Sequence, residues 1–171
     1  MQVDSVLLDS MQVTGKLVDG LLVIDLKTAL MSGDSHSVKI YYQGTPQKGL
    51  YFRTNLYGDP VIYSHNEPYD ARYWFPCKDD PSDKALLQMA VTVPDPFLVL
   101  SNGQLIEKAM FRSEMIRYVW KEDYPIATYL ISIAASPYLI ASDNFVWIAD
   151  NLLLEYYVSP DDLSRGAEAL G

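Results

Sequence analysis

One stretch of the sequence decides the fold class: residues 87–109 read LQMAVTVPDPFLVLSNGQLIEKA. Large apolar side chains stand at every second position of its first part: Leu87, Met89, Val91 and Val93. This period of two is typical of a strand with one buried face, and Pro94-Asp95-Pro96 ends the strand. Two more strand candidates, residues 97–101 and 104–109, flank Asn102-Gly103, and that dipeptide is the strongest short-range signal for a β-hairpin. The stretch therefore predicts antiparallel β structure.

Similar strand candidates continue on both sides of this stretch. They cover residues 22–26, 38–42, 50–56, 61–64, 114–121, 129–133, 145–148 and 152–158. Turn residues separate them; Gly33-Asp34, for example, marks the turn between the first two. Short strands at this spacing predict a mainly β fold, either an antiparallel β-sandwich or a saddle-like assembly of sheets.

The one clear helix signal lies near the C-terminal end of the sequence. Ser159 is a good N-cap, Pro160 suits the first helical position, and Asp161 and Asp162 favour the positive end of the helix dipole. We therefore expect a β-rich N-terminal domain over residues 1–158. Residues 159–171 are expected to open a second domain, whose remainder the sequence does not include.

Composition and charge exclude several classes of function. The 171 residues include 13 basic and 22 acidic side chains, which give a net charge of −9, and so negative a surface repels a phosphate backbone. We therefore expect no nucleic-acid partner. The longest mostly apolar stretch, residues 129–141, is interrupted by Ser132 and Pro137 and is too short to span a bilayer, so no transmembrane segment is expected. The single cysteine, Cys77, leaves no disulfide within the chain.

The residue types that catalysis needs are scarce. A zinc site takes three or four His, Cys or carboxylate ligands at workable spacing, but the chain has two histidines, His36 and His65, and one cysteine. Neither histidine lies in an HExxH motif, and the sequence contains no Cys-x-x-Cys, no glycine-rich phosphate loop and no Gly-x-Ser-x-Gly. We therefore expect no catalytic residue, no bound metal and no enzymatic activity in this chain alone.

A proline-punctuated segment between the strand candidates carries a family resemblance. Residues 64–85 read SHNEPYDARYWFPCKDDPSDKA, and Pro68, Pro76 and Pro81 exclude a long regular element there. The segment resembles a signature of the aminopeptidase N family of zinc metallopeptidases. In the N-terminal domain of that family it reads Thr-Gln-x-Glu/Gln-x-x-x-Ala-Arg, then an aromatic or aliphatic residue, then Pro-Cys-x-Asp-x-Pro-x-x-Lys-Ala.

Four shorter matches, one before this segment and three after it, stand in the same order along the chain as in that family. They are Gly49-Leu50-Tyr51, Ser101-Asn102-Gly103, residues 124–130 (YPIATYL) and residues 155–160 (EYYVSP). The resemblance implies that this chain is the N-terminal domain of a zinc aminopeptidase, an enzyme that removes N-terminal residues from peptides. It also implies that zinc is a cofactor of the full-length enzyme. The GxMEN and HExxH motifs lie further along in relatives, in a catalytic domain that would be this chain's own partner.

The resemblance assigns substrate binding to Glu67, and His65 beside it is a second candidate. Glu67 stands where the family has an acidic or amide residue that binds the free α-amine of the substrate, and an ammonium at the chain end is the feature that an internal residue lacks. Ser64 and His65 stand where the family usually has Thr-Gln; His65 could hydrogen-bond a substrate carbonyl. We therefore expect Glu67 and His65 to contact the peptide's N-terminus. Without the resemblance, Glu67 is interpreted as a solvated loop glutamate. For His65 the alternatives are a residue that tunes Glu67 by proximity and a surface histidine without function.

Other residues of the segment have structural interpretations. Asp79 is one of several acidic residues near Arg72 in the sequence, so an ion pair between Arg72 and Asp79 is expected to brace the loop rather than to contact substrate. Cys77 has no basic neighbour beyond Lys78 and is expected to be buried rather than to act as a nucleophile.

Two other functions stay open. The chain could be a stand-alone β-sandwich module that binds proteins or carbohydrates. Five tyrosines could stack on sugars: Tyr41, Tyr42, Tyr51, Tyr57 and Tyr63. The chain could also belong to relatives that have lost zinc and use the scaffold without catalysis. An HExxH motif further along the reading frame would favour the aminopeptidase.

Overall fold

The computed structural model describes residues 1–26, 28–147 and 150–165. Over these residues the chain forms fourteen strands and three short 3₁₀ helices, η1 to η3, and every strand pair is antiparallel. The prediction of a mainly β, antiparallel fold is confirmed. Within the described part of the chain, no helix is long and apolar enough to cross a membrane.

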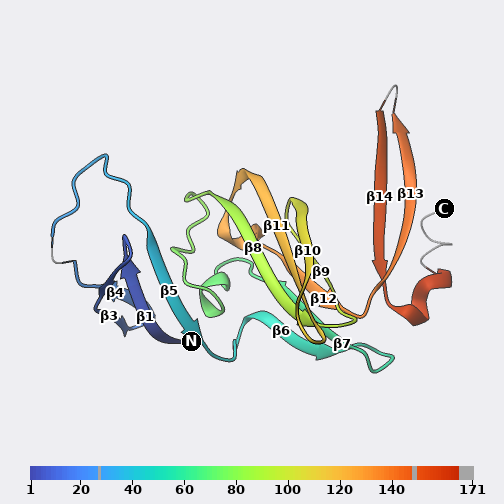
Figure 1. The fold of residues 1–171 in the computed structure, drawn as a ribbon, viewed down its shortest axis with the longest axis horizontal. Coiled ribbons are helices and arrows are strands. Elements are labelled where there is room, and N and C mark those ends of the chain that lie inside the picture. The colour runs from blue at the N-terminus through green and yellow to red at the C-terminus, as the bar shows by residue number, and fades with distance from the viewer. Residues whose placement is uncertain (27, 148–149, 166–171) are drawn as a thin grey trace.

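A two-layer sandwich forms the centre of the molecule (Figure 1). One layer has the order β6-β7-β12-β9 and consists of β6 (Gly49–Thr54), β7 (Pro60–His65), β12 (Ile133–Ser136) and β9 (Leu98–Ser101). The other has the order β10-β11-β8 and consists of β10 (Gln104–Arg112), β11 (Met115–Ile126) and β8 (Ala85–Pro94). The alternation of apolar residues in residues 87–93 therefore belongs to β8, as predicted.

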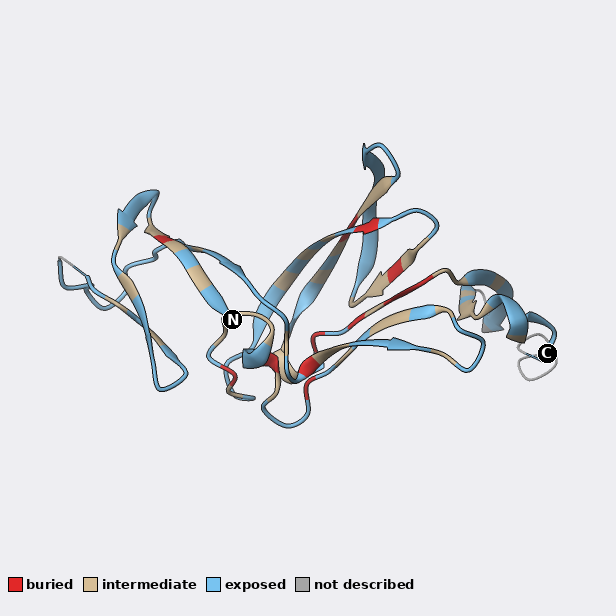
Figure 2. Cartoon of the chain, turned by 90° about the horizontal axis from the view of Figure 1, so that it is seen from below, coloured by how far each residue is buried: buried red, intermediate tan, exposed pale blue. Residues whose placement is uncertain are grey.

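The core lies between these two layers. Its buried members come from strands of both: Val93, Val99, Tyr118, Ile133 and Ala135. Removing each large side chain of this set from water contributes about 1.5–3 kcal/mol to stability. The Tyr118 hydroxyl of β11 also donates a hydrogen bond across the layers to the Phe97 carbonyl, at 3.0 Å. In Figure 2 the buried positions gather in this central part, while the lobes at both ends of the molecule are largely exposed.

The hairpin predicted at Asn102-Gly103 is wrong. β9 pairs with β12 and β10 pairs with β11, so the dipeptide carries the chain from one layer of the sandwich to the other. The Asn102 side chain donates to the Leu130 carbonyl at 3.0 Å and accepts from the Ser132 amide at 2.7 Å. Gly103 has a φ of +80° and lies so close to the β11 backbone that no Cβ would fit. The turn residues are those of a hairpin, but β9 buries Val99 in one layer of the sandwich, and β10 lies at the exposed edge of the other.

The strand predicted over residues 129–133 is also wrong in its bounds. Residues Thr128–Leu130 form the 3₁₀ helix η2, and β12 starts at Ile133. The reason is that side chains take the backbone groups that a ladder would need. The Leu130 carbonyl accepts from Asn102, and the Ile131 carbonyl accepts from Asn66.

Two small sheets form the N-terminal lobe. The first has the order β2-β1-β5, and the second pairs β3 with β4. Their strands are β1 (Gln2–Leu8), β2 (Met11–Val13), β3 (Gly15–Val18), β4 (Leu21–Ile24) and β5 (Val38–Gln43). A turn lies near Gly33-Asp34 as predicted, where the Asp34 amide donates to the Met31 carbonyl at 3.2 Å. The strands on either side of it nevertheless belong to different sheets, because β5 pairs with β1.

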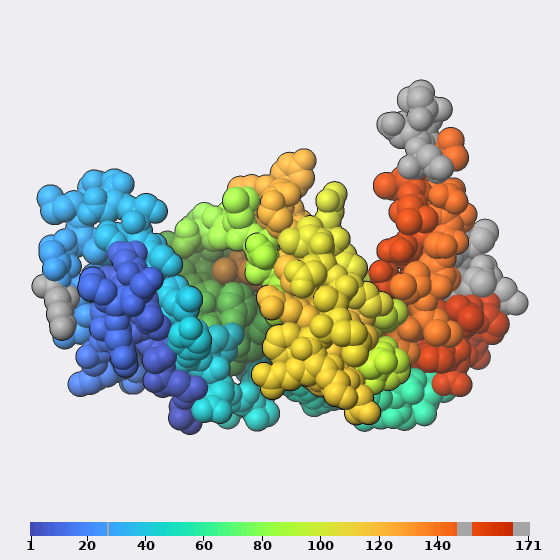
Figure 3. All heavy atoms as spheres, in the orientation of Figure 1, coloured from blue at the N-terminus to red at the C-terminus, as the bar shows by residue number. Residues whose placement is uncertain are grey.

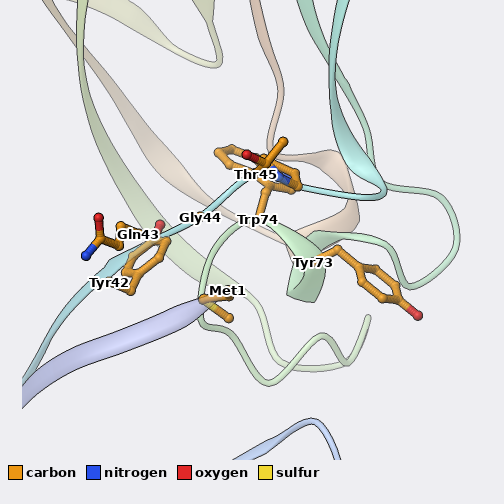
Figure 4. Close-up of a pocket in the computed structure, with 8 residues that line it drawn as sticks. Met1, Tyr42, Gln43, Gly44, Thr45, Tyr73 and Trp74 are labelled. Carbon is orange, nitrogen blue, oxygen red and sulfur yellow. The ribbon is translucent and has the colours of Figure 1, made fainter.

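The lobe joins the sandwich through the chain after β5. Figure 4 shows Met1 beside Tyr42 and Gly44, with Trp74 of the proline-punctuated segment nearby; these residues line a recess of about 20 Å³. An added Cβ at Gly44 would lie 3.3 Å from the Met1 Cα, closer than most real Cβ contacts. The glycine therefore lets the N-terminal strand approach the connection to the sandwich.

A two-stranded ribbon stands at the other end of the molecule (Figure 1). It pairs β13 (Leu139–Trp147) with β14 (Asp150–Val158), and the 3₁₀ helix η3 (Pro160–Asp162) follows. A helix does start after Ser159, but the Ser159 side chain makes no capping hydrogen bond to it. Its hydroxyl contacts Asn55 and Asp59 instead. The part of the predicted helix beyond residue 165 lies outside the described residues.

Candidate functional site

A shallow depression lies where β7 ends and β12 begins. Its volume is about 160 Å³, and its walls come from two backbone segments, residues 64–67 and 129–132. β7 and β12 are neighbours in the sheet, with Tyr63 opposite Ala134. The Ser64 hydroxyl accepts a hydrogen bond from the Ile133 amide at 2.9 Å, which joins the two walls. Strand pairing therefore brings together two segments that are distant in the sequence.

Both residues predicted to bind substrate, Glu67 and His65, line this depression. His65 is the last residue of β7, Glu67 follows two positions later, and both are exposed. In the described ranges of the chain, neither side chain has a hydrogen bond or ion pair with another residue. A carboxylate accepts hydrogen bonds from an ammonium, and an imidazole can donate one to a carbonyl. Substrate binding by the two residues stays a prediction, and both side chains are available for it.

Asn66 lies between them and is 3% exposed. Its Nδ2 donates to the Ile131 carbonyl at 2.5 Å, and its Oδ1 accepts from the Trp74 Nε1 at 2.8 Å. Asn66 is thus buried against the opposite wall, whereas His65 and Glu67 on either side of it are exposed. The sequence interpretation missed this residue, because a polar residue in a proline-rich segment looks like a solvated one.

Arg72 and Asp79 form an ion pair within the proline-punctuated segment. The Arg72 Nε donates to Asp79 Oδ2 at 2.8 Å. The Asp79 side chain is 1% exposed, whereas that of Arg72 is 48% exposed, so the carboxylate is the buried partner. Asp79 Oδ1 also accepts from the hydroxyl of Thr128, the first residue of η2, at 3.4 Å. The pair thus connects the segment to the residue that precedes the second wall of the depression, residues 129–132. The bracing role of Arg72 and Asp79 stays a prediction, which these contacts support.

Gly49, at the start of β6, lets the segment fold back on the sheet. It pairs with His65 in the ladder and has a φ of +78°. A Cβ there would collide with the Asp70 carbonyl and lie 2.7 Å from Trp74 Cδ1. Because residue 49 has no side chain, Asp70 and Trp74, which flank the 3₁₀ helix η1 (Ala71–Tyr73), can lie close to the start of β6.

Cys77 is half-buried in the same segment. Burial, together with the nearby Asp79 carboxylate, raises the pKa of the thiol to about 11. A thiol with so high a pKa is protonated at neutral pH and is a poor nucleophile. The structure agrees with the interpretation of Cys77 as a packing residue.

The described residues do not supply a zinc ligand set. In the ranges 1–26, 28–147 and 150–165, no three His, Cys, Asp or Glu side chains lie close enough together to hold a metal ion.

The sequence interpretation gave no site role to Tyr129, Leu130 or Ser132, which line the depression opposite Glu67. The YPIATYL match was the available signal, since it ends at Leu130.

Comparison with protein families and known proteins places this geometry in context. Residues 3–130 match the peptidase M1 N-terminal domain. Aminopeptidase M1-A of Oryza sativa subsp. japonica is 31% identical over 129 residues, which cover 71% of this chain and 14% of that protein. Aminopeptidase M1 of Arabidopsis thaliana is 27% identical over 167 residues, which cover 89% of this chain and 17% of that protein. The chain thus spans less than a fifth of the length of these relatives.

Solved structures share the fold. The M1 zinc metallopeptidase from Deinococcus radiodurans superposes with a TM-score of 0.77 and 20% identity, over 90% of this chain and 36% of that one. Legionella pneumophila aminopeptidase A, solved in complex with aspartic acid, gives a TM-score of 0.80 with 21% identity, over 95% of this chain and 19% of that one. With the family match over residues 3–130, these findings show that the chain belongs to the peptidase M1 N-terminal domain family.

Proposed function

We propose that this chain is the substrate-recognition domain of a zinc aminopeptidase, and that Glu67 binds the free α-ammonium of the peptide. One observation carries the proposal: His65 and Glu67 face an open depression without side-chain partners among the described residues, on a segment that the buried Asn66 anchors. Rigid placement of a free carboxylate is what recognition of a chain end requires, because a charge-assisted hydrogen bond is strong only when its geometry is held.

In this proposal the roles are divided between two domains. Glu67 accepts hydrogen bonds from the substrate ammonium, and His65 donates to the carbonyl of a bound peptide. Zinc, which polarises the scissile carbonyl when it is bound, would be held by a catalytic domain. That domain would begin at residue 159 and pack against this one, leaving residues 1–158 as the recognition domain.

The test is to replace Glu67 in the full-length enzyme. Glu67→Ala is expected to lower kcat/KM for aminoacyl substrates at least tenfold, equivalent to at least about 1.4 kcal/mol of transition-state stabilisation. The matched control is Glu107→Ala, which removes an exposed glutamate from β10. The preference for a free over an Nα-acetylated substrate should also shrink in Glu67→Ala. Wild-type kcat/KM in that variant would remove Glu67 from the site.

A binding module without activity is the second candidate, and one observation favours it. Of the five tyrosines considered for sugar stacking, Tyr51 and Tyr63 are stacked on neighbouring strands, with ring centroids 5.3 Å apart. Tyr63 is 38% exposed, so the pair offers one aromatic face. Glycan-array binding by the isolated domain that is lost in Tyr63→Ala would support this function. The absence of an HExxH motif further along the reading frame would support it as well.

A further inference from the structure

The turn between β6 and β7 holds the chain where it leaves the β13–β14 ribbon. Before the ribbon, the buried Ser136 at the end of β12 donates from its hydroxyl to the carbonyl of Pro60, the first residue of the neighbouring strand β7, at 2.9 Å. At the exit, Ser159 donates to Asp59 Oδ2 at 3.2 Å and accepts from Asn55 Nδ2 at 3.2 Å. In Figure 3 the ribbon residues otherwise stand out from the sandwich. The direction of the chain as it leaves the ribbon therefore depends on residues 55–59.

Residues 55–59, called the mount from here on, are held together by hydrogen bonds of their own. The Asn55 Oδ1 accepts from the amides of Tyr57 and Asp59 at 2.9 and 2.8 Å, and its Nδ2 donates to Asp59 Oδ2 at 3.1 Å. The backbone amide of Asn55 also donates to the Asp59 carbonyl at 2.9 Å. Asn55 thus uses its whole side-chain amide to fix the turn and the first residue after the ribbon.

A second contact extends the mount beyond Ser159. The Tyr57 hydroxyl donates to Asp162 Oδ1 at 2.6 Å, and the Asp162 amide donates to the Ser159 carbonyl at 2.9 Å. These contacts join positions more than 100 residues apart in the sequence. They hold η3 in one direction as the chain leaves the ribbon.

β7 connects this mount to the depression. The strand starts at Pro60, beside the mount, and ends at His65, beside Glu67. Six residues of strand span roughly 17–20 Å, and β7 is paired on both sides, with β6 and β12. A stiff element therefore carries the mount at one end and the candidate substrate residues at the other.

We propose that Asn55, Tyr57 and Asp59 are positioning residues. They fix the direction of the chain from Ser159 to Asp162 and so place the domain that follows relative to Glu67. This inference rests on the proposed function for its consequence in catalysis, but the mount can be tested without it.

The first experiment measures amide hydrogen exchange in this chain. Ser159→Ala and Asn55→Ala are expected to speed exchange at residues 157–163 at least tenfold, while core amides such as that of Val99 stay as in the wild type. Ser159→Thr keeps a hydroxyl and should restore slow exchange. Leu56→Ala is the control, because Leu56 lies in the same turn and is 99% exposed. Unchanged exchange in both alanine variants, or an equal rise throughout the core, would overturn the mount.

The second experiment is a double-mutant cycle in the full-length enzyme. Ser159→Ala should lower kcat/KM at least threefold when Glu67 is present and by less than 1.5-fold in the Glu67→Ala background, because the mount acts through the placement of Glu67. Equal effects in both backgrounds would overturn the positioning role. A wild-type enzyme without aminopeptidase activity would instead refute the proposed function, and hydrogen exchange would then decide the mount alone.

Discussion

Replacing Asn66 with alanine tests whether one buried amide holds the depression together. The change removes the donor to the Ile131 carbonyl and the acceptor for the Trp74 Nε1. Asn66 is 3% exposed, so water does not readily replace the lost side chain. Both former partners are then left without a hydrogen bond in a largely buried place.

The expected loss follows from these two orphaned groups. Leaving a buried donor or acceptor unpaired costs about 1–3 kcal/mol each. Ile131 is buried, but Trp74 is only partly buried, and water can reach part of its indole. We therefore expect Asn66→Ala to lower the free energy of unfolding by about 2–4 kcal/mol. For a domain of this size that corresponds to a fall in Tm of roughly 5–15 °C.

Thermal unfolding followed by tryptophan fluorescence measures this loss. Asn102→Ala is the matched control, because Asn102 likewise donates to a backbone carbonyl, that of Leu130, and accepts a hydrogen bond from the Ser132 amide. Asn102 is more exposed than Asn66, so water can replace the lost amide and the loss should be only about 1 kcal/mol. Asn66→Asp keeps an acceptor for Trp74 but sets a carboxylate oxygen against the Ile131 carbonyl. Its destabilisation should therefore be large at pH 7 and smaller at pH 4, where the introduced carboxyl binds a proton.

Two results would refute this reasoning. The first is a Tm of Asn66→Ala within about 2 °C of the wild type, since even the lower estimate exceeds that shift. The second is an equal loss in the Asn66 and Asn102 alanine variants. Either would mean that burial of the amide does not hold the two walls together.

Three further predictions concern other parts of the chain. Gly103→Ala should lower the free energy of unfolding by about 2–4 kcal/mol, because a Cβ there would meet the β11 backbone. Gly58 has a φ of +96° but faces open space, so Gly58→Ala should lower it by only about 1 kcal/mol. Urea unfolding of the two variants measures both losses. At pH 8 iodoacetamide should label Cys77 about 200-fold more slowly than an ordinary thiol, since its pKa is raised to about 11; rapid labelling would contradict the burial of the thiol. Hydrogen bonds from the His36 side chain and the Ser37 amide lower the pKa of Asp9. Asp9 therefore stabilises the loop around His36 fully above the ordinary carboxyl pKa, and this stabilisation is lost as the pH falls through the lowered pKa of Asp9. Below about pH 4 the protection of the loop amides, measured against the intrinsic exchange rate at each pH, should fall in the wild type, and Asp9→Asn should remove this dependence on pH.

Local patterns in the sequence were sufficient for the fold class and the family. The alternation at residues 87–93 predicts a strand with one buried face, and that strand is β8, whose Val93 lies in the core. The prolines of residues 64–85 correctly exclude a long regular element there. The family resemblance brought His65 and Glu67 to attention, and they do line one depression. Each of these features is set by residues close together in the chain, so it can be predicted from a single sequence.

Which strands pair with each other could not be predicted from such local patterns. Asn102-Gly103 has the composition of a hairpin turn, yet β9 pairs with β12 and β10 with β11. A turn signal states only that the chain reverses. Which strands then pair depends on how much apolar surface each arrangement buries, and that sum runs over residues far apart in the chain.

The contacts that shape the site are of this second kind. Asn66 reaches Ile131, Asp79 reaches Thr128, and Asn55 reaches Ser159. Each of these polar residues is of a type common in exposed loops, and each hydrogen-bonds to a partner that only the fold brings near. Side-chain type and periodicity follow from the order of residues along the chain, but burial and hydrogen-bond partners arise when distant segments pack together.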